Sequence, residues 1–129
     1  MASHGVDLVQ IARIERLWRE HGDRFLTRVF TPAERAYCLD SRTPAERLAG
    51  RFAAKEAVLK VLGTGWRAGI GWADVETLPD ALGRPVVTLH GVAAQLAAAA
   101  QIGSVIVSIS HSGDYVLASA IGLRAPVRA

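Results

Sequence analysis

The spacing of hydrophobic residues alternates between two periods along the chain, which predicts a mixture of strands and helices. Short apolar runs rich in β-branched residues predict strands over residues 5–9, 74–78, 86–89, 104–110 and 115–123. Apolar residues three or four positions apart predict helices over residues 10–21, 23–30, 44–62 and 90–101, and one that starts at 31. We therefore expect one α+β domain over residues 1–129, with an antiparallel sheet packed against a long central helix and shorter helices.

Local signals mark the ends of the predicted helices. The sequence Thr-Pro-Ala-Glu-Arg occurs at 31–35 and again at 43–47. In each copy Thr is typical of an N-cap, Pro of the first helical position and Glu of the third, so both copies predict a capping box. Gly22 predicts the end of one helix and Asp23 the cap of the next. The glycines of 63–65 predict the end of the long helix and the start of a loop.

Composition excludes several classes of protein. The chain has 129 residues, of which 50% are hydrophobic and 21% charged, so it is not a disordered chain. No apolar run approaches the ~18 residues of a membrane helix, and residues 1–10 lack the pattern of a secretory signal. The single cysteine, Cys38, excludes an internal disulfide and a Cys-based zinc site, and a packed thiol is expected. We therefore expect a cytoplasmic protein that does not enter a membrane.

Positive charge is concentrated in the first half of the chain. The formal net charge is +3, and most of the 15 Lys and Arg residues are Arg. Because the planar guanidinium donates two hydrogen bonds at once to a carboxylate or phosphate, an acidic partner is one interpretation. A solvated, Arg-rich surface is the other, and charge alone favours it.

The predicted helix over 44–62 has charged residues in an unusual place. Lys55 falls inside its apolar stripe, and Glu56 and Lys60 lie at the edge of that stripe. A charge within an apolar stripe costs several kcal/mol unless it is paired. The simplest interpretation is that Glu56 and Lys60 form an ion pair worth about 0.3–0.5 kcal/mol, while Lys55 extends out to solvent. The alternative is a binding site beside this helix.

Two further features have no clear structural role in the sequence. Asp7 interrupts an apolar strand, so it either caps the next helix, faces solvent on an edge, or converges with Glu56 on a divalent cation. Two carboxylates suit Mg²⁺ better than zinc. The run Ser-Ile-Ser-His-Ser at 108–112 places hydrogen-bond donors at a strand end, where they could contact a phosphate or a base. A Ser-based catalytic triad is disfavoured, since Gly-x-Ser-x-Gly is absent.

Taken in order, these segments form a known set. They are Gly5-Val6-Asp7, Arg51-Phe52-Ala53-Ala54-Lys55-Glu56-Ala57 with Lys60, Gly63-Thr64-Gly65, Asp74-Val75-Glu76, Gly83-Arg84-Pro85 and Ser108-Ile109-Ser110-His111. The chain resembles the holo-[acyl-carrier-protein] synthases, the small 4′-phosphopantetheinyl transferases of fatty-acid synthesis. The resemblance runs over residues 5–122, and its most specific part is the segment 51–57.

The resemblance implies a reaction and an assembly. Members of this family transfer 4′-phosphopantetheine from coenzyme A to a serine of apo acyl carrier protein, and they release adenosine 3′,5′-bisphosphate. The resemblance also implies a 4′-phosphopantetheinyl transferase fold and a homotrimer with active sites between subunits. Polyketide carrier proteins are further possible acceptors.

The resemblance also implies roles for individual residues. Asp7 and Glu56 match the Mg²⁺ ligands, with Glu56 or a bound water as the base, and Lys60 matches the lysine that contacts the phosphates. The remaining coenzyme A contacts match Arg51, Gly63, Gly65, Arg84, Pro85 and His111.

The same resemblance implies a binding partner for the arginine-rich first half of the chain. Acyl carrier proteins are acidic, and Arg13, Arg24 and Phe25 match positions that dock them. Two other functions compete with this hypothesis. One is a binding module for an acidic protein or RNA, although the exposed strand aromatics of RNA-binding modules are missing from the pattern, and we expect no nucleic-acid partner. The other is a metal-dependent hydrolase of a diphosphate.

Overall fold

The computed structural model describes residues 2–63 and 69–126. Within them, one sheet contains five antiparallel strands in the order β1-β5-β4-β3-β2. The strands are β1 (Ser3–Gln10), β2 (Val75–Pro79), β3 (Pro85–Leu89), β4 (Ile102–Ser112) and β5 (Tyr115–Arg124). The helices are α1 (Ile11–His21), α2 (Asp23–Val29), α3 (Pro32–Leu39), α4 (Pro44–Leu62) and α5 (Gly91–Ala99), with a 3₁₀ turn η1 (Trp72–Asp74). The predicted α+β fold is confirmed.

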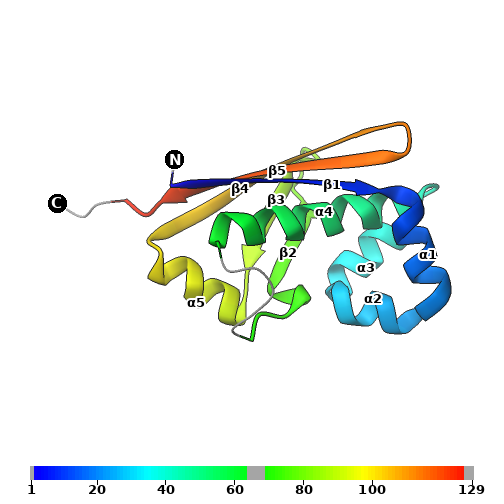
Figure 1. Ribbon diagram of the computed structural model, residues 1–129, viewed down its shortest axis with the longest axis horizontal. Coiled ribbons are helices and arrows are strands. Elements are labelled where there is room, and N and C mark those ends of the chain that lie inside the picture. The colour runs from blue at the N-terminus through cyan, green and yellow to red at the C-terminus, as the bar shows by residue number, and fades with distance from the viewer. Residues whose placement is uncertain (1, 64–68, 127–129) are drawn as a thin grey trace.

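Helix α4 organises the molecule. It runs along one face of the sheet, with α1, α2 and α3 gathered at one of its ends and α5 near the other (Figure 1). Most of its residues are buried, so the buried surface of α4 is wider than the apolar stripe predicted from the sequence. Among the described residues, no helix is both long and apolar enough to cross a bilayer.

The strand β1 lies unusually close to α4. Burial alternates along β1, so that Gly5, Asp7 and Val9 share the face turned toward the helix. A Cβ placed on Gly5 would lie 2.2 Å from the carbonyl oxygen of Ala57 and 2.8 Å from Cβ of Lys60. Only glycine permits this approach, and it sets the first strand directly against the helix that carries Glu56 and Lys60.

The predicted helix caps are confirmed in one case and wrong in two. At α3 the Thr31 hydroxyl accepts from the backbone N–H of Glu34, whose carboxylate accepts from Thr31 N, so the capping box is present. At α4 the Thr43 side chain makes no capping hydrogen bond. At α2 the N-cap is Gly22, and Asp23 is the first helical residue instead of the cap.

Two groups of the second predicted box have other partners. The backbone N–H of Thr43 donates to Oγ of Ser41 at 3.0 Å. The Glu46 carboxylate lies 3.4 Å from Nε2 of His111, so a tertiary contact takes it away from the helix start. Strand β4 continues through Ser112, two residues beyond the end of the strand predicted over 104–110. His111 therefore stands on the strand, near the N-terminal end of α4.

The core contains the expected thiol and one unexpected charge pair. Cys38 is buried, and burial raises the pKa of its thiol to about 11, which makes it a poor nucleophile. Lys55 does not extend to solvent. Its side chain is fully buried against the carboxylate of Glu34, 2.7 Å away, so the predicted solvent-exposed lysine is wrong.

Candidate functional site

The exposed end of α4 and the middle of β1 form a charged cluster. Nζ of Lys60 donates to the carbonyl oxygen of Val6 at 2.6 Å and lies 3.4 Å from Oδ1 of Asp7. The Asp7 side chain keeps 19% of its surface exposed and the Lys60 side chain 53%. The strand therefore presents its carboxylate to the helix at a position that ligands can reach.

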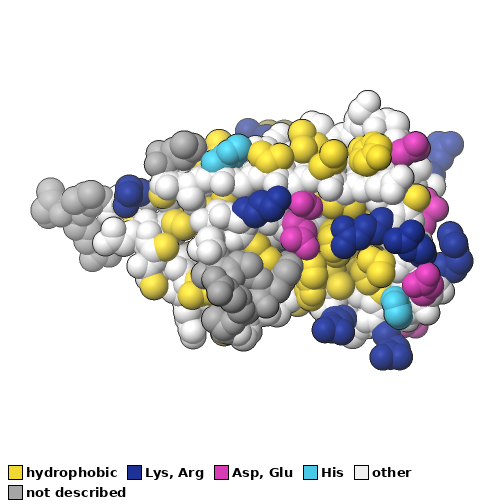
Figure 2. Space-filling view, viewed as in Figure 1, with side chains coloured by type: hydrophobic (Ala, Val, Ile, Leu, Met, Phe, Trp, Pro, Cys, Tyr) yellow, Lys and Arg dark blue, Asp and Glu magenta, His cyan; other side chains and the backbone are white. Residues whose placement is uncertain are grey.

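Glu56 joins this cluster through the helix itself. It lies one turn before Lys60, on the same side of α4, and next to Ala57, whose carbonyl oxygen meets Gly5. Its side chain is half-buried. Figure 2 shows acidic side chains with Lys or Arg side chains beside them at the centre of this face. The structure thus brings the Asp7 carboxylate to the Lys60 ammonium group from a segment 53 residues away, with Glu56 one helical turn before Lys60.

An apolar groove with a basic rim lies beside the cluster. It has a volume of about 790 Å³, and it is bounded by α1, α2, the middle of α4 and η1; its lining includes Arg13, Leu17, Arg24, Phe25, Arg28, Val29, Phe52 and Trp72. The Phe52 and Trp72 rings stack with centroids 4.9 Å apart and an interplanar angle of 26°. The guanidinium of Arg13 lies 5.4 Å from the centre of the Phe52 ring. In Figure 2, hydrophobic side chains lie at this position with Lys and Arg side chains around them.

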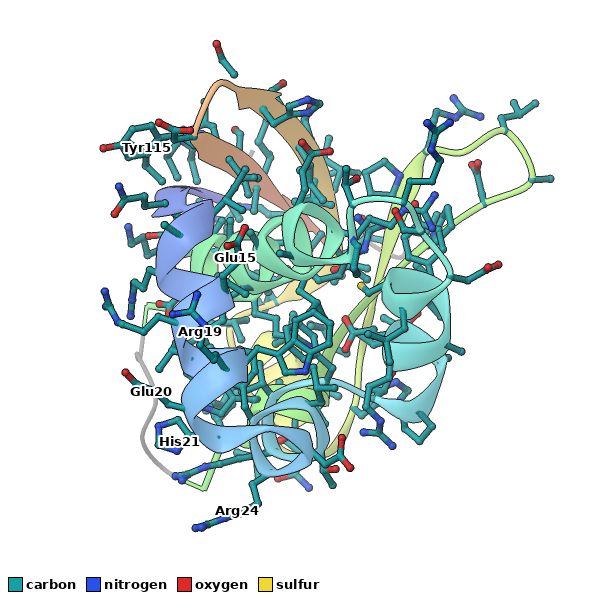
Figure 3. The ribbon with its side chains drawn as sticks, turned by 90° about the vertical axis from the view of Figure 1, so that its right-hand side faces the viewer. Glu15, Arg19, Glu20, His21, Arg24 and Tyr115 are labelled. Carbon is teal, nitrogen blue, oxygen red and sulfur yellow. The ribbon has the colours of Figure 1, made fainter. Side chains whose placement is uncertain are left out.

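The three residues predicted to dock an acidic partner all line this groove. Arg13 and Arg24 are exposed, and Arg24 points away from the body of the molecule in Figure 3. Phe25 is buried, with its ring edge-on to Phe30 at 5.7 Å. Sequence reasoning missed the contribution of Phe52 and Trp72. Phe52 could have been found from its place in the motif at 51–57. Trp72 could not, because the segment around it shows neither the helical nor the strand spacing of apolar residues.

The other predicted coenzyme A contacts lie away from the charged cluster. His111 is beside Glu46, fourteen residues before Lys60 on α4, which corresponds to about 21 Å along the helix axis. Arg84 and Pro85 belong to the β2–β3 hairpin, and three strands separate β2 from β1. Within one chain, these residues therefore do not join the charged cluster of Asp7 and Lys60.

Two predicted residues close to α4 differ in their placement. Arg51 is buried, with its guanidinium over the Tyr37 ring at 4.6 Å, and it lies half a turn around α4 from Lys60. Gly63 ends α4 with φ 77°, a left-handed conformation that glycine adopts freely. Gly65 lies outside the described residues.

The face of the sheet opposite α4 is apolar, and none of the helices in residues 2–63 and 69–126 covers it. On β1 and β5, Leu8 pairs with Leu117, and both point away from the helix. Ile106 on β4 pairs with Val86 on β3 in the same layer. Their exposed fractions are 59%, 41%, 52% and 48%, and Figure 2 shows a row of hydrophobic side chains over the strands. A patch of this kind typically marks an interface.

Comparison with known proteins identifies the family to which this fold belongs. Residues 3–120 match the 4′-phosphopantetheinyl transferase superfamily. The chain belongs to this superfamily. It is 49% identical over 117 residues to a holo-[acyl-carrier-protein] synthase of Protochlamydia amoebophila, with 91% of this chain and 93% of the relative covered.

Solved structures of the family superpose on most of the chain. The holo-[acyl-carrier-protein] synthase of Neisseria meningitidis matches with a TM-score of 0.88 and 33% identity, over 96% of this chain and 99% of that one. The Helicobacter pylori enzyme, solved in complex with coenzyme A, matches with a TM-score of 0.82 and 30% identity, over 93% and 99% of the two chains. The resemblance inferred from the sequence motifs is confirmed.

Proposed function

We propose that this chain transfers 4′-phosphopantetheine from coenzyme A to a serine of apo acyl carrier protein and releases adenosine 3′,5′-bisphosphate. The family membership and the names of the relatives support the reaction, and the coenzyme A complex of the Helicobacter pylori enzyme supports the donor. The observation that carries the proposal is the contact between Asp7 and Lys60, because it assembles the phosphate-handling groups next to an apolar groove with a basic rim.

The donor atoms of the cluster fit Mg²⁺. Asp7 and Glu56 offer carboxylate oxygens, and no group of three or more His, Cys, Asp or Glu side chains within residues 2–63 and 69–126 forms a complete metal cage. Mg²⁺ is commonly held by one or two carboxylates together with waters and substrate phosphates. The two side chains would hold the ion, which supplies charge neutralisation and orientation of the diphosphate when it is bound.

Lys60 and Glu56 handle the charges of the transfer. The serine oxygen of the carrier attacks the phosphorus that bears pantetheine, and the bridging oxygen leaves on adenosine 3′,5′-bisphosphate. Lys60 neutralises the phosphates, since its half-exposed ammonium can turn from the Val6 carbonyl to a bound ligand. Glu56 accepts the serine proton, directly or through a water.

The groove serves as the dock for the carrier. Arg13, Arg24 and Arg28 present positive charge around an apolar floor, and acidic helices of a carrier protein complement both features. Opposite charges accelerate encounter and fix orientation more than they add affinity.

Two copies of the chain complete each donor site. Asp7, Glu56 and Lys60 belong to one end of α4, while His111 and the Arg84–Pro85 hairpin lie too far away to reach the same diphosphate in one chain. The uncovered sheet face provides the surface on which copies associate, and we propose a homotrimer in the cytoplasm. Mixing an inactive Asp7→Ala variant with an inactive His111→Ala variant restores part of the activity if sites are shared, and no recovery contradicts a shared site.

A direct assay separates this function from hydrolysis of a diphosphate. The protein is incubated with coenzyme A, Mg²⁺ and an apo acyl carrier protein, and the carrier is weighed by mass spectrometry. The proposal expects a gain of one phosphopantetheine on the carrier. An unchanged carrier together with cleaved coenzyme A identifies a hydrolase, and an unchanged carrier with intact coenzyme A leaves a binding module.

A further inference from the structure

The buried pair of Lys55 and Glu34 is saturated with hydrogen bonds. Nζ of Lys55 donates to Oε1 of Glu34 at 2.7 Å, to the carbonyl oxygen of Trp72 at 3.1 Å and to that of Val75. These three acceptors match the three protons of an ammonium group. Both side chains are fully buried. Apolar residues of similar volume often stabilise a core as well as a buried ion pair, so stability alone is a weak reason for this pair.

The same pair connects four elements. Glu34 belongs to α3, and besides Lys55 it accepts hydrogen bonds from the backbone N–H groups of Thr31 and Thr77, both at 2.9 Å. Lys55 belongs to α4, and its other acceptors lie on η1 and at the start of β2. The pair therefore fixes the positions of η1 and the start of β2 relative to α4.

Trp72 is held to α4 at two points. Lys55 binds its backbone carbonyl, and Phe52, three residues earlier on the same helix, stacks on its ring. Phe52 and Trp72 both line the groove beside the charged cluster. The position of the indole wall of the groove thus depends on a buried ammonium group that never reaches the groove itself.

We propose that Lys55, together with Glu34, is a positioning residue for recognition of the carrier protein: it holds the backbone of Trp72 so that the indole completes the groove. This inference rests on the proposed function of the groove as the carrier dock. It predicts an effect on the KM for apo carrier that is separate from coenzyme A binding.

The test compares Lys55→Met with the wild type in the phosphopantetheine transfer assay. We expect the KM for apo carrier to rise about tenfold, the equivalent of one lost aromatic contact, while the Kd for coenzyme A stays within about twofold. A second variant, Lys55→Met with Glu34→Gln, removes both charges and leaves no unpaired buried carboxylate, so it serves if the single variant does not fold. An unchanged carrier KM in a folded variant overturns the proposal.

Trp72→Ala turns this test into a double-mutant cycle. If Lys55 acts through Trp72, Trp72→Ala raises the carrier KM, and adding Lys55→Met to it produces little further increase. Two increases that multiply in full overturn the proposal, because Lys55 then acts by another route. Hydrogen exchange should also be faster at the backbone amide of Val75, which bonds to the Trp72 carbonyl, in Lys55→Met.

Val58→Ala is the matched control. Val58 is fully buried on the same helix and makes none of the hydrogen bonds of the pair, so its truncation destabilises the core while those bonds keep their partners. We expect a lower melting temperature and an unchanged carrier KM. An equal rise of the carrier KM in Val58→Ala overturns the proposal, since general destabilisation would then explain it. Absence of transfer by the wild type itself refutes the proposed function, whereas normal wild-type transfer with an unaffected Lys55→Met variant refutes this inference alone.

Discussion

The two lysines of α4 show how one helix separates structure from chemistry. Lys55 is fully buried, and burial lowers the pKa of its ammonium group while the carboxylate of Glu34 opposes the shift. Lys60, five residues later, is 53% exposed and touches Asp7 and the Val6 carbonyl. The buried lysine has no bond left to offer, whereas the exposed one can exchange a partner for a phosphate. Geometry is fixed on one side of the helix, and charge is available on the other.

The largest expected effect concerns the exposed side. Asp7→Ala and Glu56→Ala should each lower kcat by about a thousandfold or more, because each removes a carboxylate from the proposed Mg²⁺ site. The thermal midpoint should stay within a few degrees, since both side chains keep contact with solvent. Steady-state transfer assays and thermal denaturation check this. Near-normal turnover of either variant removes that residue from the site.

Gly5→Ala should disturb both the packing of α4 and the charged cluster of Asp7 and Lys60. The added methyl group would lie 2.2 Å from the Ala57 carbonyl oxygen, so β1 must move away from α4 and take Asp7 with it. We expect a loss of about 1–3 kcal/mol in the free energy of unfolding from overpacking, together with a strong loss of turnover. Gly71→Ala is the control, because its φ is −93° and the nearest atom of the described residues would lie 3.8 Å from its Cβ. Equal stability of the two variants would contradict the close approach.

Lys60→Ala should separate binding from folding. We expect the KM for coenzyme A to rise and kcat to fall, each by about tenfold, from the loss of one charge-assisted contact to phosphate. Stability should change by less than about 0.5 kcal/mol, because exposed ion pairs contribute little. Initial-rate kinetics and urea denaturation measure the two quantities. Unaffected kinetics would assign Lys60 a purely structural role.

Arg13→Glu should act on one substrate only. Reversing a charge at the rim of the groove should raise the KM for apo carrier by about tenfold at low salt, with a smaller effect at high salt because exposed charges are screened. The KM for coenzyme A should stay nearly constant. Measuring both constants at two ionic strengths checks the docking surface, and an equal loss for both substrates would contradict it.

The smallest effect is expected beside the buried pair. Oγ1 of Thr77 is buried without a hydrogen-bond partner among the described residues, although its backbone N–H bonds to Glu34. Thr77→Val replaces this hydroxyl with a methyl group of similar shape, so the free energy of unfolding should stay unchanged or rise by up to about 1 kcal/mol. Chemical denaturation measures the change. A clear loss of stability would indicate that the hydroxyl is bonded in solution.

Local signals predicted the elements of this fold better than its contacts. The capping box at Thr31 formed because all its groups lie within four residues. The second copy formed no box: the Thr43 N–H donates to Ser41, and Glu46 lies beside His111, which is far along the chain. The unusual charge in the long helix was visible at Lys55, but its partner Glu34 was hidden, since that residue was already explained as part of a cap.

In the candidate site, too, individual residues were predicted better than the contacts between them. Asp7, Glu56 and Lys60 stood out because charged groups interrupt apolar patterns. The close approach at Gly5 and the stack of Phe52 on Trp72 could not be predicted, because the spacing of residues does not indicate which elements contact each other. The split between the charged cluster and His111 likewise needed the sheet order and the length of α4.

The bare apolar face of the sheet has a kinetic consequence. If copies associate through Leu8, Ile106 and Leu117 as proposed, dilution separates them, and each separated chain keeps only its own part of the proposed donor site. Specific activity should then fall with decreasing enzyme concentration and recover on concentration, so that the rate per molecule becomes a direct reading of self-association.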